Sequence, residues 1–156
     1  MEVARLETRG VIANIEKTLS ECPAAYHGDE FPLFHSFADG VYVREIHLPA
    51  GTLLTGKIHR HSHPNFLMTG KVTVLTEEGG VEHLEGPCYM MSPAGTKRAV
   101  YVYEDCIWIT VHVTDETDLK KIEEYVIAPA YEDEELNSNQ IKALEELWLG
   151  SQQEQH

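Results

Sequence analysis

Cysteine is scarce in this chain of 156 residues, and its three cysteines, Cys22, Cys88 and Cys106, are widely spaced with no C-x-x-C pair. Such a set is typical of free thiols in a reducing compartment and does not indicate a disulfide framework. Long apolar runs are missing too, since no stretch approaches the ~18 residues that a membrane span needs, and the opening MEVARLETRG has no apolar signal segment. We therefore expect a cytoplasmic protein that folds without disulfides.

Basic residues are also few, with 12 Lys and Arg against 26 Asp and Glu, which gives a net charge of -14. This charge repels nucleic acid and anionic membrane surfaces, so we expect neither as a partner. The hydrophobic fraction of 42% and the charged fraction of 24% are those of an ordinary globular protein. A small molecule is the expected partner of a chain of this kind.

Short runs rich in Val, Ile, Tyr and Thr fill the region from Val41 to His112. Turn signals such as Pro49-Ala50-Gly51 and Gly79-Gly80 separate these runs at strand-length intervals, a pattern that predicts an all-β sandwich or barrel. The predicted strands lie near residues 41–48, 52–59, 65–69, 71–76, 81–84, 88–92, 98–103 and 106–113.

Helical spacing appears on both sides of the strand-rich region. Apolar residues recur every three or four positions over residues 11–19 and again over 119–126, which predicts two short helices. The chain is therefore divided into three predicted parts: an N-terminal arm with a short helix (1–36), a β-barrel (37–115) and a C-terminal helical extension (116–156).

The C-terminal extension is expected to end in a helix over residues 137–149, with Asn137 or Ser138 as its N-cap, after a loop at 131–135. Three apolar residues share one face of this helix: Ile141, Leu144 and Trp148. Such a face needs a partner surface, and we expect a second copy to supply it in a homodimer. The alternative is that the helix folds back on its own barrel.

The order of glycines and histidines between residues 51 and 70 resembles the first motif of the cupin family, G-x5-H-x-H-x3,4-E-x6-G. The matching positions are Gly51, Lys57, His59, His63 and Gly70. A second cupin motif, G-x5-P-x-G-x2-H-x3-N, is approximated with one extra residue before the proline. Its positions are Gly86, Pro93, Gly95 and Arg98.

The resemblance implies a small-barrel (RmlC-like) cupin, which is a double-stranded β-helix or jelly roll with short flanking helices. The sequences PAGTKR and EDCIWITVH are also similar to those of short cupin proteins found in phage genomes. A phage protein of this kind would act in the host cytoplasm.

The resemblance also implies a site. In metal-bearing cupins the histidines and glutamate of the first motif and the histidine of the second hold a divalent ion, and here these positions carry Lys57, His59, His63 and Arg98. His63 can still bind a metal through neutral imidazole, whereas Lys and Arg are cationic and are not ordinary metal ligands. The metal prediction therefore keeps His59 and His63.

Either His112 or His61 completes this ligand set. His61 shares a strand face with His59 if the strand runs straight, but it has no counterpart in the motif. His112 lies on the strand expected to close the barrel and can approach from the opposite sheet, so we prefer it. A site of three histidines suits iron, zinc, nickel, cobalt, copper or manganese, and the sequence does not distinguish them.

The two substituted positions suggest an anionic ligand. The resemblance places Lys57 and Arg98 on the inside of the barrel, where a carboxylate or phosphate could pair with both cations. Asn65 shares the face of His63 and could add a hydrogen bond. The leading hypothesis is a protein that binds a divalent metal and a small anion, either as a binding protein or as a metal-dependent oxygenase, isomerase or lyase.

Two other functions stay open at this point. One is a metal-free module that binds a nucleotide or sugar phosphate, which in a phage would serve counter-defence. The other is a structural scaffold that keeps the barrel without a working site.

Overall fold

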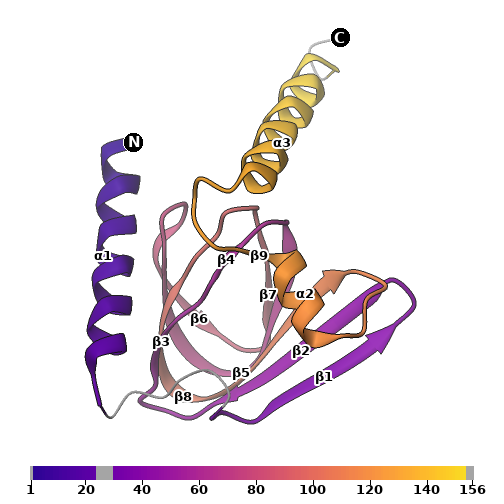
Figure 1. Ribbon diagram of the computed structural model, residues 1–156. Helices are drawn as coiled ribbons and strands as arrows, with labels where there is room; N and C mark the ends of the chain where they lie inside the picture. The colour runs from indigo at the N-terminus through magenta and orange to yellow at the C-terminus, as the bar shows by residue number, and fades with distance from the viewer. Residues whose placement is uncertain (1, 24–29, 154–156) are drawn as a thin grey trace.

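Two long antiparallel strands form the centre of the barrel in the computed structural model, which describes residues 2–23 and 30–153. They are β5 (His63–Thr76) and β8 (Ala99–Val113). The main sheet has the order β1-β2-β8-β5-β6, with β3 paired to β8 and β7 paired to β5 (Figure 1). The other members of this sheet are β1 (Leu33–Ala38), β2 (Val41–Leu48), β3 (Leu53–Thr55), β6 (Gly80–Glu85) and β7 (Cys88–Ser92). Because all these pairs are antiparallel, the predicted all-β class is confirmed.

A second, two-stranded sheet closes one end of the barrel. It pairs β4 (Ile58–His59) with β9 (Ile127–Ala128), so that a segment beyond the barrel returns to cover it. The apolar core lies between the two halves of the main sheet. Its buried members are Leu48, Leu67, Val72, Val74, Val100, Val102, Cys106 and Trp108.

The two central strands run through positions that the sequence predicted as turns. The register between β5 and β8 shifts around Gly70, where the backbone has a φ of 96°. A bulge of this kind bends a strand without ending it. Both β5 and β8 bend at this point, so each strand contributes to both halves of the barrel. The predicted strand breaks between residues 69 and 71 and between residues 103 and 106 are therefore wrong.

Replacing Gly70 with alanine is expected to lower the free energy of unfolding by roughly 3 kcal/mol or more. A Cβ there would lie 2.6 Å from the carbonyl oxygen of Asp105, and the positive φ adds strain. Gly10→Ala is a matched control, because its Cβ would meet no atom within 4 Å and alanine favours a helix by about 1 kcal/mol. Urea unfolding of both variants checks this, and a Gly70→Ala protein as stable as wild type would contradict it.

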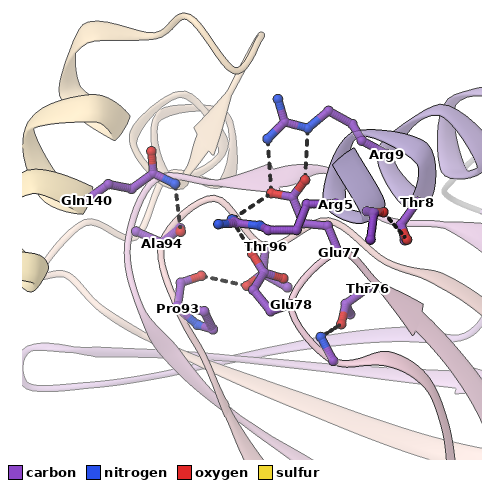
Figure 2. Close-up of polar contacts among 12 residues, drawn as sticks. Arg5, Thr8, Arg9, Thr76, Glu77, Glu78, Pro93, Ala94, Thr96 and Gln140 are labelled. Carbon is purple, nitrogen blue, oxygen red and sulfur yellow. Dashed lines mark hydrogen bonds and ion pairs between the residues drawn. The ribbon is translucent and has the colours of Figure 1, made fainter. Parts of the chain in front are cut away.

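The first helix, α1 (Glu2–Glu21), lies beside the barrel and is longer than the predicted helix over 11–19 (Figure 1). Polar contacts attach it to the sheet, because Arg9 donates two hydrogen bonds to the carboxylate of Glu77, at 2.9 and 3.0 Å (Figure 2). Arg5 reaches the same carboxylate, and Lys97 pairs with Glu16. Apolar spacing did not predict residues 2–10 of this helix, where four charged residues interrupt it: Glu2, Arg5, Glu7 and Arg9.

Two further helices follow the barrel. The predicted helix over 119–126 is present as α2 (Leu119–Val126), which buries Ile122 and Val126. The last helix, α3 (Glu134–Gln153), begins before the predicted N-cap, and the side chain of Asp133 accepts a hydrogen bond from the backbone N–H of Leu136. The loop expected over 131–135 ends at Asp133, and Glu134 and Glu135 lie in the first turn of α3, where negative side chains are favourable. In the described part of the chain, no helix is long and apolar enough to cross a bilayer.

Candidate metal and ligand site

Three histidines from separate strands meet inside the barrel. His59 comes from β4, His63 from the start of β5 and His112 from the end of β8. Their ring centres are 4.3 Å apart for His59 and His63, 4.9 Å for His63 and His112, and 5.6 Å for His59 and His112. The structure thus brings together the three histidines that the sequence proposed as metal ligands.

Burial keeps these three rings neutral. Desolvation lowers the pKa of His59 from 6.5 to about 3, with further lowering by His63 and His112. It also lowers the pKa of His63 to about 4 and that of His112 to about 4. Since neutral imidazole is the form that binds metals, the cluster is ready to act as a set of nitrogen donors at neutral pH.

Two ring nitrogens of the cluster are buried without a hydrogen-bond partner among the described residues: Nδ1 of His59 and Nε2 of His63. An unsatisfied buried polar atom costs about 1–3 kcal/mol, so such a pair indicates that something else binds there. The donor chemistry suits a transition metal, because imidazole nitrogens are common ligands of zinc and related ions.

The donor atoms do not yet form a complete metal site. No group of three or more His, Cys, Asp or Glu side chains in the described ranges is arranged so as to hold a metal ion. The rings of His59 and His112 are almost parallel, at 6°. Metal binding would therefore require the imidazole rings to rotate, while the distances between their ring centres could stay as they are.

The metal-free protein is expected to lose stability as the pH falls from 6.5 toward 4. Because the folded pKa values of the three histidines lie below 6.5, the unfolded chain binds protons that the folded chain does not, and the free energy of unfolding falls with pH. Each histidine contributes at most about 1.4 kcal/mol per pH unit in this window. Above pH 6.5 both states are neutral at these groups and the effect is absent.

Urea unfolding of chelator-treated protein between pH 7 and 4.5 measures this slope. His112→Gln should make the slope shallower, whereas His83→Gln, at an exposed position on β6, should not. Equal slopes in the wild type and His112→Gln would show that the cluster does not titrate in this way.

A partly buried arginine lies next to the histidines. Arg98 donates a hydrogen bond to Oγ of Ser92, and its guanidinium lies 5.6 Å from the centre of the Trp108 ring. Desolvation lowers its pKa to about 10, so it stays charged at neutral pH. Among the described side chains no carboxylate forms an ion pair with Arg98, although a buried cation is costly unless an anion accompanies it. This position can therefore accept the negative group of a ligand.

Asn65 is fully buried on the same strand face as His63, as predicted. Its amide nitrogen donates to Oγ of Ser92 at 2.7 Å, and its amide oxygen accepts from Nε1 of Trp108 at 3.2 Å. Since Ser92 also accepts from Arg98, the four side chains form one polar network. The hydrogen bonds of Asn65 are thus directed to protein atoms, where they position Ser92 and through it Arg98.

Lys57 does not face the interior, and this part of the prediction is wrong. Its side chain is 63% exposed and forms an ion pair with Glu123 on α2. The physical reason is that the predicted strand over 52–59 breaks into β3 and β4, so that strict alternation across Gly56 and Lys57 is lost.

His61, the alternative third ligand, lies outside the cluster on the loop after β4. Its ring stacks on Tyr125 with ring centres 4.7 Å apart, and its Nε2 lies 3.5 Å from a carboxylate oxygen of Glu135. The loop is fixed by Arg60, which donates two hydrogen bonds to Asp133, at 3.1 and 3.0 Å. Of the two alternatives left open by the sequence, the structure places His112 and not His61 with the other two histidines.

A cavity of about 240 Å³ lies between the cluster and the C-terminal segment. It is lined by His61, Ser62, His112, Val113, Tyr125 and Val126. His112 therefore faces the cluster on one side and this cavity on the other. Because pockets for drug-sized ligands measure about 300–1,000 Å³, this cavity would suit a smaller molecule.

Two side chains of β2 near the cluster were not proposed from the sequence: Tyr42 and Arg44. Tyr42 is buried, stacks on His112 with ring centres 5.9 Å apart and shares a hydrogen bond of 2.6 Å with Nδ1 of His35. Arg44 lies two residues further along the same face, and its charge helps to lower the pKa of His112. Even-numbered residues of β2 share a face with the buried Leu48, so strand alternation could have placed Tyr42 and Arg44 on that face.

Comparison with known proteins gives structural similarity without sequence similarity. No family model matches the sequence, and a search of curated proteins found no match. A cupin superfamily protein from Desulfitobacterium hafniense is similar in structure, with a TM-score of 0.47, 11% identity, and coverage of 58% of this chain and 83% of that chain.

Two further solved structures are also similar. A conserved protein with a double-stranded β-helix domain from Klebsiella pneumoniae has a TM-score of 0.47, 16% identity, and coverage of 56% of this chain and 80% of that one. A DMSP lyase from Ruegeria pomeroyi has a TM-score of 0.46, 19% identity, and coverage of 60% of this chain and 54% of the lyase. This chain thus matches little more than half of the lyase.

Proposed function

We propose that this protein is a cupin-type barrel that binds a divalent transition metal through His59, His63 and His112 and a small organic anion through Arg98. The observation that supports it is the cluster of three imidazoles, with His63 and His112 buried, in which Nδ1 of His59 and Nε2 of His63 have no partner among the described residues. Buried polar groups in proteins normally have a hydrogen-bond partner, and a bound metal would supply one for these nitrogens.

The residues of the proposed site have two separate roles, anion binding and metal binding. Arg98 binds the carboxylate or phosphate group of the ligand, and the hydrogen bonds from Asn65 to Ser92 and from Arg98 to Ser92 fix the direction of the guanidinium. The three histidines hold the ion, which would polarise an oxygen of the ligand as a Lewis acid. Trp108 and the apolar core beneath them exclude water from this end of the barrel.

The second candidate is a metal-free binding protein for a small anion. The specific observation in its favour is that the imidazoles are not arranged to hold an ion as they stand, whereas Arg98 needs no rearrangement to accept an anion. The cavity beside His112 is not lined by Arg98, so its volume does not set the size of the anion for either candidate.

Elemental analysis of untagged protein, followed by thermal unfolding with phosphate, acetate and succinate, distinguishes the candidates. Metal retained through a desalting column together with an anion-dependent rise in Tm supports the proposal. An anion-dependent rise that persists after chelation, with no metal retained, supports the metal-free protein. If the protein retains no metal and its Tm does not change with any of the anions, the scaffold hypothesis remains. A ligand at 100 times its Kd should stabilise the fold by about 2.7 kcal/mol, which would raise the Tm.

A further inference from the structure

His59 is the member of the histidine cluster that the main sheet supports least. His63 and His112 lie on the long central strands β5 and β8, whereas His59 lies on β4, which has two residues and forms a separate sheet with β9. The backbone N–H of His59 donates to the carbonyl oxygen of Thr96 at 3.4 Å, and its carbonyl oxygen accepts from the N–H of Gly95 at 2.8 Å. The position of His59 therefore depends on segments other than the central strands.

The residues on either side of His59 are anchored in the part of the chain that returns to the barrel through β9. Ile58 is 7% exposed and forms an apolar cluster with Ala128 and Leu136. Arg60 binds the same part of the chain through its side chain and its backbone. Since side chains alternate along a strand, His59 between them faces the barrel interior.

Arg60 holds both ends of the return segment, residues 124–133. Its backbone N–H donates to the carbonyl oxygen of Val126 at 2.8 Å, and its guanidinium donates to the carbonyl oxygen of Glu124. The same guanidinium donates two hydrogen bonds to the carboxylate of Asp133, at 3.1 and 3.0 Å, where the two side chains are 15% and 13% exposed. A bidentate pair of this kind is strong and directional. Arg60 therefore ties the return segment to β4.

The start of α3 braces the same loop. The side-chain amide of Asn139 donates to the carbonyl oxygen of Arg60 at 2.8 Å, and that of Gln140 donates to the carbonyl oxygen of Ala94 at 3.3 Å (Figure 2). Further along α3, which projects away from the barrel (Figure 1), three apolar residues are 58%, 66% and 67% exposed: Ile141, Leu144 and Trp148. Beyond Gln140 the helix does not fold back on the barrel, so only its first turns brace the loop.

We propose that Arg60 and Asp133 are positioning residues of the metal site, which fix the backbone of His59 beside His63 and His112. The inference rests on the proposed function, because it takes these three histidines as the ligands. Arg60 and Asp133 act through His59, by holding the return segment against the short strand that carries it. Altering a group that orients a metal ligand lowers metal affinity about 10–100-fold, and a loss of this size is expected when the pair is broken.

Cobalt titration of Arg60→Gln and Asp133→Asn, followed by visible absorption, tests the proposal. Both proteins should bind cobalt at least about tenfold more weakly than wild type. Asp133→Asn is the sharper variant, because asparagine is also a good N-cap and can still accept the hydrogen bond from the N–H of Leu136. What it removes is the charge that pairs with Arg60.

Two control variants separate positioning from a general loss of stability. Leu84→Ala shortens a side chain that packs against the core from β6, at the edge of the main sheet, so it should lower the Tm and leave cobalt affinity unchanged. Lys57→Gln removes the exposed ion pair with Glu123 on α2, which should matter little. Cobalt affinity equal to wild type in Arg60→Gln and Asp133→Asn, or an equal loss in Leu84→Ala, would overturn the proposal.

A second measurement needs no metal. In ¹H–¹³C NMR spectra of the histidine rings, with the His59 signal assigned through His59→Gln, the metal-free wild type and Leu84→Ala should give one sharp His59 signal. In Arg60→Gln this signal should shift or broaden, while that of His83 on β6 stays the same. An unchanged His59 signal would overturn the positioning role. A signal that depends on Arg60 in a protein that binds no cobalt would support that role and contradict the proposed metal function.

Discussion

Replacement of both His59 and His63 by alanine is expected to reduce the retained metal from about one ion per chain to almost none. Removing two of three protein ligands should cost more than the 10–100-fold loss that follows from altering groups that merely orient a ligand. The fold should survive, because Nδ1 of His59 and Nε2 of His63 have no hydrogen-bond partner in the described structure, and His63→Ala loses a contact of 3.2 Å between Nδ1 and the carbonyl oxygen of His61. Elemental analysis and circular dichroism of untagged protein make the two measurements.

The control variant replaces two histidines that lie away from the cluster. His47 shares a hydrogen bond with Glu45, and His83 shares one with Thr73. A protein with His47→Ala and His83→Ala has lost as many imidazoles, so it should retain as much metal as wild type. Equal metal content in all three proteins would show that the cluster is not the metal site, and loss of the folded signal would mark His59 and His63 as structural.

Arg98→Met is expected to abolish anion binding and at the same time to stabilise the protein. Methionine fills a similar volume, and removing a buried cation that lacks an ion-pair partner among the described residues relieves its desolvation cost. Loss of the charge pair with a bound anion should weaken binding by roughly 2–5 kcal/mol. Titration calorimetry with succinate and a thermal melt without ligand give the two numbers.

Arg98→Lys tests whether anion binding needs the planar guanidinium group or only its positive charge. It should weaken succinate binding less than Arg98→Met does, because an ammonium keeps the charge but cannot donate two parallel hydrogen bonds. If Arg98 instead braces the turn that contains Pro93 and Gly95, both substitutions would lower the Tm and leave the affinity unchanged. That result would remove Arg98 from the ligand site.

The histidine cluster could be predicted because its members lie on regular strands or at motif offsets. His59 and His63 were proposed from the first motif, and His112 from its place on the strand expected to close the barrel. On β8, Trp108 and His112 are both buried, as alternation along a strand requires. Strand alternation therefore predicted correctly that His112 shares a buried strand face with Trp108.

Lys57 could not be placed in this way because its position depends on where a strand breaks. The pairing of β3 with β8 ends at Thr55, and β4 pairs with β9, a segment from beyond the barrel. The competition between these two partners is a tertiary effect that no local pattern shows. For the same reason the continuation of β5 through Gly70 was missed, since a bulge and a turn both require the same backbone conformation.

The start of α3 shows a different limit. Asn137 and Ser138 are good capping residues, and so is Asp133, which precedes two glutamates. The choice between them follows from Arg60, which pairs with Asp133 from a loop more than 70 residues earlier in the chain. A capping preference is worth about 1 kcal/mol, so one tertiary contact is enough to decide between two candidate caps.

The position of β8 also has a consequence for the order of folding. This strand pairs with β2, β3 and β5, and its contact with β2 joins Val41 to Val113. By contrast, β5 and β6 form a hairpin between Lys71 and Glu85. Contacts between distant parts of a chain form late because closing the long loop costs entropy before any pairing compensates it.

The β5–β6 hairpin should therefore form first and β8 should dock last. His112 is also the last of the three histidines to leave the ribosome, since it lies near the end of β8. The imidazoles can thus meet only when the barrel closes. Partly folded chains would lack the cluster, and stopped-flow refolding should show the signal of a bound cobalt ion appearing at the same rate as the native fluorescence of Trp108.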